Sequence, residues 1–368
     1  MGVAAPRGDQ PAGARRPAEP PVGVLPPARL VGLPPALTGG PRGDPSVAGF
    51  LLRRLTASFL LLFAVATGVF FLVHAAPGDP TDVFEGQRIN REQRETLRHL
   101  YGLDRPLGEQ YLRWLAALAQ GELGLSLAQQ RPVATILAEA FPATLLLATG
   151  AIAVEFGIAL LLGIAAARRP GGYADQTIRL GSLVFVSQPP FWIALMLVLL
   201  FAHLWPVLPA SHMRSVDADL LSPAGRAWDL LRHLLLPSLA LGLYNAGSTL
   251  RFVRGSVIEV MGTDYIRAAR ARGLSERRVL WVHGLRNALT PLIQLFALSF
   301  PQLLNGALLT EIIFAWPGLG RATFAAVLSR DYPLILGLTL FSAFVVILGN
   351  LLADLLQAAA DPRVRRHA

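Results

Sequence analysis

Six long apolar runs constrain this chain more than any other feature of its sequence. A run of about 18 or more apolar residues with few charges is long enough to cross a bilayer as an α-helix. Six such helices are too many to bury in the core of a water-soluble protein of 368 residues. The sequence therefore predicts an all-α polytopic membrane protein with six transmembrane helices. The runs are residues 55–73, 143–167, 180–202, 234–250, 287–310 and 333–353.

The first run has a second interpretation. Arg53 and Arg54 precede it, and a basic pair before an apolar stretch also begins a secretory signal peptide. The run is longer than the usual apolar core of a signal peptide, and it starts only after some fifty residues. We therefore expect a helix that is retained in the membrane.

Two residue types are missing, and their absence excludes several chemistries. All 33 basic residues are arginine, and the chain has no cysteine. A Walker A phosphate loop and a Schiff-base enzyme both need lysine. Thiolate metal sites and cysteine nucleophiles need cysteine. We therefore expect no catalytic residue and no cofactor of these kinds in the chain. His203, His212 and His233 lack the close spacing of a metal site, so we expect solvated histidines there.

The arginines are concentrated on alternate connections between the runs. Cytoplasmic connections of membrane proteins carry an excess of Lys and Arg. With a cytoplasmic N-terminus, the inner side holds Arg53, Arg54, Arg168, Arg169, Arg179, eight arginines between residues 251 and 286, and three after residue 361. The two short outer loops hold only Arg214, Arg226, Arg232, Arg321 and Arg330. The distribution predicts a multi-pass protein of the cytoplasmic membrane with both termini in the cytoplasm.

The N-terminal segment differs in kind from the rest. Residues 1–49 contain eleven prolines and nine glycines, without helical or strand periodicity. This composition is typical of a disordered tail, and a start codon misassigned upstream of Phe50 explains it equally well. We divide the remainder into residues 50–141, with the first transmembrane helix and an extracytoplasmic helical segment, residues 142–358, with five helices, and a cytoplasmic tail at 359–368.

The connection between the fourth and fifth runs, residues 255–286, is the most informative segment. Thr263 or Asp264 can cap a helix over residues 265–272, and Gly273 suits the left-handed conformation that ends a helix. Ser275 can cap a second helix that follows. The many arginines place these helices at or beyond the membrane surface. A basic loop attracted to anionic lipid, a nucleic-acid patch and a docking element for a cytoplasmic partner all fit this pattern.

Short motifs follow one another from residue 77 to residue 363. They are Pro77-Gly78-Asp79-Pro80, Tyr101-Gly102-Leu103-Asp104-Arg105-Pro106-Leu107, Gln110-Tyr111, Arg113-Trp114, Pro142-Ala143-Thr144-Leu145, Asp264-Tyr265, Arg267-Ala268-Ala269-Arg270-Ala271-Arg272-Gly273-Leu274-Ser275, His283, Arg286-Asn287-Ala288-Leu289, Pro291, Trp316-Pro317-Gly318-Leu319-Gly320, Asp331-Tyr332-Pro333, Asn350, Asp354 and Asp361-Pro362-Arg363. In this order, over about residues 50–366, they resemble permease subunits of ABC importers, most closely the dipeptide/oligopeptide/nickel subgroup. Arg267-Ala268-Ala269 stands where the family's EAA loop begins with Glu-Ala-Ala.

The resemblance implies an ABC importer type I transmembrane domain, which is a pore-forming subunit and not an enzyme. It implies that Asp264, Tyr265, Arg267, Ala268, Ala269, Arg270 and Gly273 form a loop that couples to a cytoplasmic ATPase, with Ala268, Ala269 and Gly273 as the docking core. The implied partners are ABC ATPase subunits that hydrolyse ATP, a second homologous permease, an extracytoplasmic substrate-binding protein and membrane lipid, without nucleic acid. The implied location is a bacterial or archaeal cytoplasmic membrane.

The transported solute is not specified by the sequence. Di- or oligopeptides are the first expectation from the resemblance, and a nickel complex or glutathione is the alternative. A stand-alone secondary transporter is a more distant alternative, and such proteins often show two repeats with interrupted spans. Glu155 lies in the middle of a run, where an acidic residue usually faces other helices or water. We expect interhelical or pore-facing packing for Glu155 and leave the role of Glu311 open.

Overall fold

The computed structural model describes residues 1–2, 47–76, 95–96, 98–99, 102–288, 292, 295–296, 299, 301 and 307–360. The chain divides into Met1–Asp44 and Pro45–Ala368, and the helices described below belong to the second unit. Several expectations lie wholly or largely outside the described residues: most of the tail at 1–49, the motif at 77–80, much of the run at 287–310, and the segment from residue 361 onward.

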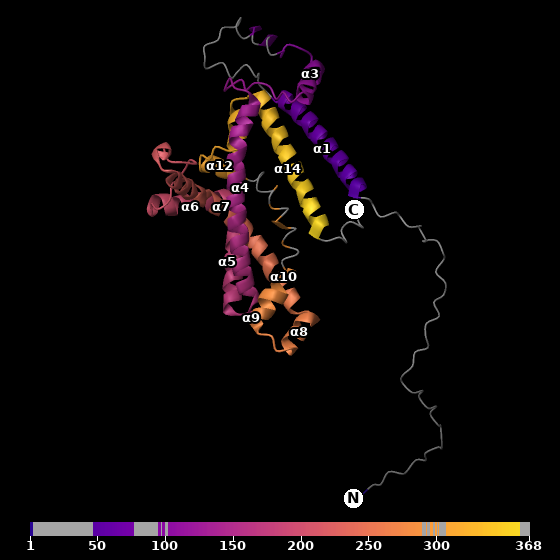
Figure 1. Cartoon of the computed structure of the whole chain (residues 1–368), viewed down its shortest axis with the longest axis vertical. Helices are drawn as coiled ribbons and strands as arrows, with labels where there is room; N and C mark the ends of the chain where they lie inside the picture. The colour runs from indigo at the N-terminus through magenta and orange to yellow at the C-terminus, as the bar shows by residue number, and fades with distance from the viewer. Residues whose placement is uncertain are drawn as a thin grey trace, which may run out of the picture. The chain divides into compact units, whose positions relative to one another are not determined.

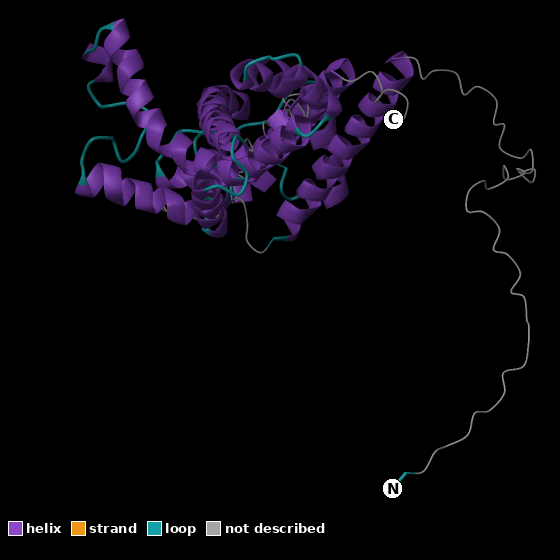
Figure 2. Cartoon of the chain, turned by 90° about the horizontal axis from the view of Figure 1, so that it is seen from below, coloured by secondary structure: helices purple, strands orange, loops and turns teal. Residues whose placement is uncertain are grey.

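Every regular element in the described part of the chain is helical, as expected (Figures 1 and 2). The longest helices are α1 (Val47–Ala75), α4 (Val133–Ala167), α7 (Pro223–Met261) and α14 (Tyr332–Ala360). The shorter ones are α3 (Leu107–Ala119), α5 (Tyr173–Ser187), α6 (Pro190–Val198), α8 (Asp264–Ala271), α9 (Glu276–Arg278), α10 (Leu285–Ala288), α12 (Leu308–Ile313) and α13 (Leu319–Leu328), with the π-helical turns η2 (Leu199–Leu204) and η4 (Val279–Gly284) and the 3-10 turn η3 (Ala218–Leu220).

Among the described residues, three helices are long and apolar enough to cross a membrane by themselves. They are α1, α4 and α14, and the bent pair of α5 with α6 would make a fourth. The first, second and sixth apolar runs lie in the three single helices, and the run at 234–250 lies inside α7. Because much of the run at 287–310 is outside the described residues, the count of six transmembrane helices stays a prediction.

The third run is not one straight helix, contrary to the expectation from its length. α5 ends at Ser187, α6 begins at Pro190, and the chain bends by 101° between the two helices. Gln188 has an extended backbone, because a residue that precedes a proline is pushed out of the helical region. Pro190 then occupies the start of α6, where its missing N–H costs no hydrogen bond. The proline pair therefore ends one helix and starts another in a new direction.

Two helices begin earlier than the sequence patterns indicate. α4 starts at Val133, so Pro142 lies inside the helix and the expected boundary between residues 141 and 142 crosses a continuous element. Beside this proline, the indole Nε1 of Trp316 donates a hydrogen bond of 2.7 Å to the carbonyl oxygen of Ala143. α1 starts at Val47, inside the segment whose composition indicates a tail.

Glycines let α4 and α7 pack closely along their lengths. A Cβ atom on Gly163 would lie 2.8 Å from Cγ1 of Val253, and one on Gly242 would lie 2.6 Å from Cβ of Val154. Small residues at such positions allow the backbones of membrane helices to approach each other. Glu155 of α4 is buried in this contact and accepts a hydrogen bond of 2.6 Å from the hydroxyl of Thr249 on α7. Its expected interhelical packing is therefore observed.

The motif Trp316-Pro317-Gly318-Leu319-Gly320 forms the turn between α12 and α13 and encloses the carboxylate of Glu311. Oε1 of Glu311 accepts a hydrogen bond of 2.6 Å from the hydroxyl of Thr144, and Oε2 accepts one of 3.0 Å from the backbone N–H of Arg321. A Cβ atom on Gly318 would lie 2.2 Å from Oε1 of Glu311. The glycine is therefore needed because the carboxylate lies directly against the backbone of the turn.

The motif Asp331-Tyr332-Pro333 begins α14 and fastens it to the segment before α4. Oδ1 of Asp331 accepts a hydrogen bond of 3.2 Å from the N–H of Leu334, which caps the helix. Oδ2 accepts hydrogen bonds of 2.6 Å from the Ser126 hydroxyl and 3.0 Å from the Ala128 N–H. The fully buried Asp331 thus joins two segments that are some two hundred residues apart in sequence.

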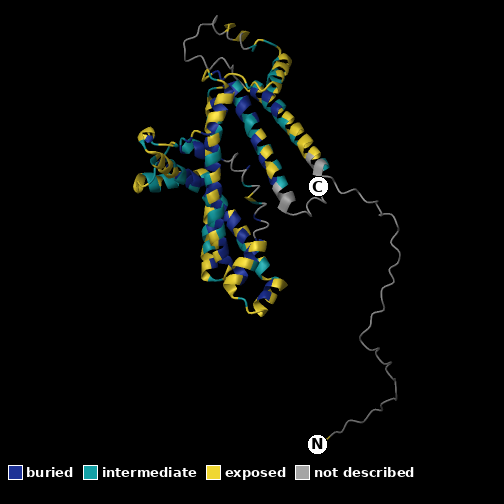
Figure 3. Ribbon diagram, viewed as in Figure 1, coloured by how far each residue is buried: buried dark blue, intermediate teal, exposed yellow. Residues whose placement is uncertain are grey.

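Aromatic side chains join α3 to α1. The ring of Phe70 on α1 lies 5.2 Å from Tyr111 and 5.3 Å from Trp114, measured between ring centroids. The Tyr111 hydroxyl is also 2.7 Å from the hydroxyl of Thr67. Much of the remaining surface of α1 is exposed and apolar, with Leu52, Phe59 and Leu72 among its exposed side chains (Figure 3). An apolar surface of this kind fits contact with lipid or with another subunit.

Candidate functional site

The segment that connects α7 to α10 forms a compact projection at one end of the helical unit. It contains α8, α9 and η4, and Figure 1 shows α8 and α9 beyond the end of α5. α8 begins immediately after Gly262 and Thr263, which follow the end of α7. The projection is therefore attached directly to the longest of the described helices. Its outer surface is largely exposed (Figure 3).

The local sequence explains where α8 begins and ends. Thr263 is the N-cap residue, with extended backbone, and Asp264 places a negative charge in the first turn, where the helix dipole favours it. The helix ends at Gly273, whose φ angle of +79° is left-handed. The N–H of Gly273 bonds the carbonyl of Arg270 at 2.9 Å, and the N–H of Leu274 bonds that of Ala269 at 3.4 Å. This pair of bonds is the Schellman arrangement, which glycine favours.

The second helix also follows the expectation from the sequence. Ser275 is the N-cap of α9, and the helix continues through the π-helical turn η4, which contains Trp281 and His283. The projection is thus a short helix, a glycine turn and a second helix. The expected helix at 265–272 differs from α8 by a single residue at each end.

α8 has one buried face and one exposed face. Ile266 and Ala269 are buried against Val279 of η4, with Met261 and Leu274 packed beside them. The remaining predicted residues are exposed, namely Asp264, Tyr265, Arg267, Ala268, Arg270 and Gly273. Ala269 is only 1% exposed, so it supports the projection from inside, whereas the resemblance implied a direct docking contact. Among the predicted residues, Ala268 and Gly273 are the two small ones that are exposed.

Hydrogen bonds and ion pairs join α8 to α9 and to α10, and one further ion pair lies within α8. Nε of Arg270 donates to Oε1 of Glu276 at 2.8 Å across the glycine turn. The side-chain amide of Asn287 donates to the hydroxyl of Tyr265 at 2.8 Å. Arg267 pairs with Asp264 at 3.1 Å along α8. Exposed ion pairs contribute only about 0–1 kcal/mol each, so these contacts orient the exposed face more than they stabilise the fold.

A second exposed patch lies on the other helix of the projection, and the sequence patterns did not single it out. Arg277, Arg278, Trp281 and Val282 line a shallow hollow of about 530 Å³ together with Ser275. Trp281 is 55% exposed, which is unusual for so large an apolar side chain. The spacing of Arg277 to Trp281 and Arg278 to Val282, four residues in each case, places them on one helix face. This spacing of four residues is the feature of the sequence from which the patch could have been predicted.

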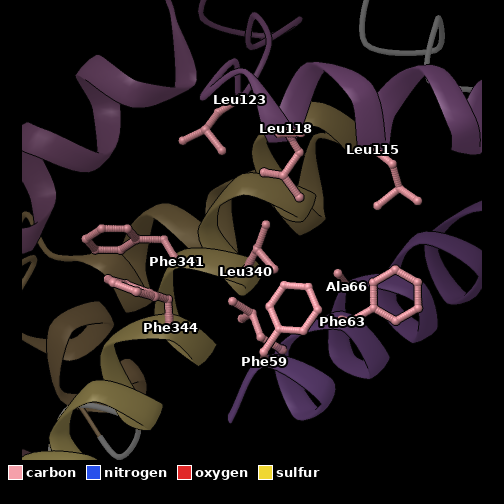
Figure 4. A pocket seen from close by; sticks show the side chains of 11 residues that line it. Phe59, Phe63, Ala66, Leu115, Leu118, Leu123, Leu340, Phe341 and Phe344 are labelled. Carbon is pink, nitrogen blue, oxygen red and sulfur yellow. The ribbon is translucent and has the colours of Figure 1, made fainter. Parts of the chain in front are cut away.

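A large apolar cavity elsewhere in the molecule has no features of a solute site. It has a volume of about 440 Å³, lies between α1, α3 and α14, and is lined entirely by apolar side chains (Figure 4). Phe59 and Phe63 of α1 and Phe344 of α14 are among the side chains that line it. A charged or polar solute would find no hydrogen-bonding side chain there. In the described part of the chain, no group of three His, Cys, Asp or Glu side chains is arranged to hold a metal ion.

Comparison with known proteins identifies the family. Residues 159–366 match the family model described as "Binding-protein-dependent transport system inner membrane component", and residues 47–148 match the N-terminal model of the same transport systems. The chain is 34% identical over 319 residues to the oligopeptide transport system permease protein AppB of Bacillus subtilis, covering 86% of this chain and 99% of the relative. It is 38% identical over 330 residues to the di/tripeptide transport system permease protein DppB of Pseudomonas aeruginosa, covering 86% and 98%.

A third relative is the dipeptide transport system permease protein DppB of Escherichia coli K12. Identity is 36% over 333 residues, covering 86% of this chain and 98% of the relative. Among solved structures, the MetNI methionine ABC transporter in inward-facing conformations is similar with a TM-score of 0.47 and 16% identity, covering 61% of this chain and 96% of that one. The extent of the family match and the identity to full-length relatives show that the chain belongs to the inner membrane components of binding-protein-dependent transport systems.

Proposed function

We propose that this chain is the pore-forming permease of an ATP-driven importer for di- or oligopeptides. Family membership supports the role of a multi-pass transport subunit in the inner membrane. The names of the three relatives support peptides as the solute, because each is a permease of a peptide, dipeptide or oligopeptide transport system. A second, homologous permease would complete the pathway, and an extracytoplasmic binding protein would deliver the solute.

The exposed face of α8 is the observation that supports coupling to an ATPase. It combines a small side chain, Ala268, with exposed charged and polar groups on either side and a tight turn at Gly273. Such a face can lie against another protein, because a small residue lets the partner approach the helix backbone. The chain has no lysine with which to build a Walker A loop, so ATP hydrolysis is assigned to cytoplasmic ABC ATPase subunits.

The orientation in the membrane follows from this docking role. If α8 contacts a cytoplasmic ATPase, the projection of α8, α9 and η4 is cytoplasmic. The concentration of arginine between residues 251 and 286 supports the same side. Both termini are then also cytoplasmic in the six-helix topology, and α3 lies on the extracytoplasmic side.

Substitution of Gly273 tests the docking role. The position is open, with no atom within 4 Å of the place that a Cβ would occupy, so the cost of a side chain comes from the backbone conformation alone. A left-handed conformation costs about 1–2 kcal/mol for most residues, and asparagine tolerates it better than valine. We expect Gly273→Val to insert in the membrane normally but to lose co-purification of the ATPase and peptide uptake in reconstituted vesicles.

Gly273→Asn is the matched control, because it adds a side chain of similar size but accepts the left-handed backbone. We expect it to retain most ATPase association and most uptake. Full association and full uptake by Gly273→Val would contradict the docking role. The wild type could instead take up another solute and no peptide, in a reaction that depends on the ATPase. That result would contradict the proposed substrate class but leave the docking role intact.

A further inference from the structure

A basic groove lies between α5 and α7, at the end of the helical unit that carries the projection of α8, α9 and η4. It has a volume of about 530 Å³ and is lined by Gln176, Arg179, Leu180, Leu183, Arg251 and Arg254. Residues 176, 179, 180 and 183 recur at the spacing of one face of a helix, and residues 251 and 254 do the same on α7. Two helices therefore direct cationic side chains into one hollow.

One of the three arginines is fixed by an ion pair that also joins the two helices. Nε and Nη2 of Arg254 donate to the two carboxylate oxygens of Asp175 at 2.6 and 2.7 Å. Oδ2 of Asp175 also accepts a hydrogen bond of 2.7 Å from the N–H of Gly171. The side chain of Asp175 is fully buried, so this two-bond contact holds Arg254 in place beside the groove that it lines.

The other two arginines provide positive charge that is not neutralised by an ion pair within the described residues. Arg179 and Arg251 are both exposed, and in the described part of the chain neither forms an ion pair. The polar contact of the Arg251 guanidinium is a bond of 3.4 Å to the hydroxyl of Ser248. Three guanidinium groups and one carboxylate thus leave two positive charges in excess. Such a site suits a phosphate group, which arginine binds through charge-assisted hydrogen bonds.

The surface next to the groove is apolar, which indicates the kind of molecule that carries the phosphate. Leu180 and Leu183 are 65% and 50% exposed, and Val184 and Phe185 continue the exposed apolar face along α5. A path for a charged peptide would need polar groups beyond the arginines. Arginines at the end of a membrane helix, with an exposed apolar surface beside them, are instead the arrangement that binds anionic lipid headgroups.

We propose that this groove binds the phosphate of an anionic phospholipid, with the acyl chains of the lipid lying along the apolar face of α5. In the orientation proposed above, the lipid belongs to the inner leaflet. The ion pair of Arg254 with Asp175 sets the spacing of α5 and α7, and Arg179 and Arg251 hold the headgroup. Because Arg251 and Arg254 belong to α7, a bound lipid would contact the helix that carries the docking projection.

Lipid titration of the complete transporter tests this proposal. Native mass spectrometry would count phosphatidylglycerol bound to the wild type and to the double variant Arg179→Gln/Arg251→Gln. We expect the double variant to bind about thirtyfold more weakly, because two arginines near a headgroup contribute about 1 kcal/mol each and about 1.4 kcal/mol corresponds to a factor of ten. Arg179→Lys/Arg251→Lys keeps both charges and should retain most of the binding. Phosphatidylcholine with the same acyl chains should bind weakly to all of these proteins.

The control Arg214→Gln/Arg226→Gln removes the same charge from exposed positions outside the groove and should bind phosphatidylglycerol like the wild type. Equal binding by wild type and Arg179→Gln/Arg251→Gln would overturn the proposal. So would displacement of the lipid by millimolar inorganic phosphate, which would identify a site for free phosphate, or by a peptide with a free carboxylate, which would identify a solute site. Co-purification of the ATPase, read in the same samples, reports separately on the docking role of α8.

Discussion

Ala268 and Ala269 are neighbours in α8 that face opposite environments. The first is exposed, and the second is buried beside Ile266 and Val279. A bulky charged side chain at Ala269 would need space inside the projection and would remove the charge from water, which costs several kcal/mol when the charge has no partner. The same side chain at Ala268 would extend into solvent. Substitutions at the two positions therefore test separately the folding of the projection and its proposed contact with a partner.

We expect Ala269→Arg to loosen the projection and Ala268→Arg to leave it folded. Trypsin cuts after arginine, and the projection contains several arginines that serve as cleavage sites. Cleavage between residues 262 and 288 should become faster in Ala269→Arg and stay at the wild-type rate in Ala268→Arg. Both variants should lose ATPase association, the first through misfolding and the second through steric bulk.

The two alanine variants have the same charge and size, so each is the control for the other. Wild-type protease resistance in Ala269→Arg would show that residue 269 is not packed inside the projection. Wild-type ATPase association in Ala268→Arg would argue that the exposed face of α8 is not the docking surface.

At the scale of elements, the turn between α12 and α13 depends on one hydroxyl group of α4. The Thr144 hydroxyl donates to Glu311 at 2.6 Å and accepts from the N–H of Leu319 at 2.8 Å. Thr144 and Glu311 are both buried. If the hydroxyl is removed, no water can replace it as the partner of the Glu311 carboxylate and the Leu319 N–H. A buried polar group left without its partner costs about 1–3 kcal/mol.

Thr144→Val should therefore lower the thermal stability of the purified protein. Valine has nearly the shape of threonine but no hydroxyl, so it removes the two hydrogen bonds while keeping the packing. Thr144→Ser keeps the hydroxyl and should stay close to the wild type. The midpoint of thermal aggregation in detergent would compare the three proteins, and equal midpoints for Val and Ser would contradict the role assigned to the hydroxyl.

Local signals in the sequence predicted the projection well but did not predict its packing. The cap at Thr263 and the turn at Gly273 each depend on residues only a few positions apart. A short sequence pattern is therefore enough to predict where α8 begins and ends. The burial of Ala269 depends on Val279, which reaches it only after the chain has turned back. The bond between Asp331 and Ser126 joins residues 205 positions apart, and no short pattern encodes it.

The long helices also show that a local pattern predicts an element but not its final geometry. Length and hydropathy located the helices α1, α4 and α14, because a membrane-spanning helix needs a long apolar run. The third run meets the same criterion, but the proline pair at residues 189 and 190 divides it into α5 and α6 with a bend of 101°. Pro142 gave a misleading signal, because proline usually marks a helix start and here lies inside α4.

For the whole molecule, the topology in the membrane determines which segments face the cytoplasm and which face the outside. Reporter fusions after Arg168 and within residues 262–288 should give a cytoplasmic signal, because arginines are concentrated there and the proposed docking face of α8 lies in the second segment. Fusions within α3 should give an extracytoplasmic signal. A cytoplasmic signal from α3 would contradict the six-helix topology, whatever the outcome of the ATPase and lipid experiments.

The length of α7 has a mechanical consequence. Its 39 residues make a rod of about 58 Å, and α8 is attached to one end of it by only two residues. The other end is held near Ser215, whose hydroxyl donates to Asp229 at 2.6 Å. A tilt of about 10° in such a rod displaces one end relative to the other by about 10 Å. Glycine contacts keep α7 close to α4, so a rotation of α7 at the end that carries the projection would also move the opposite end of both helices.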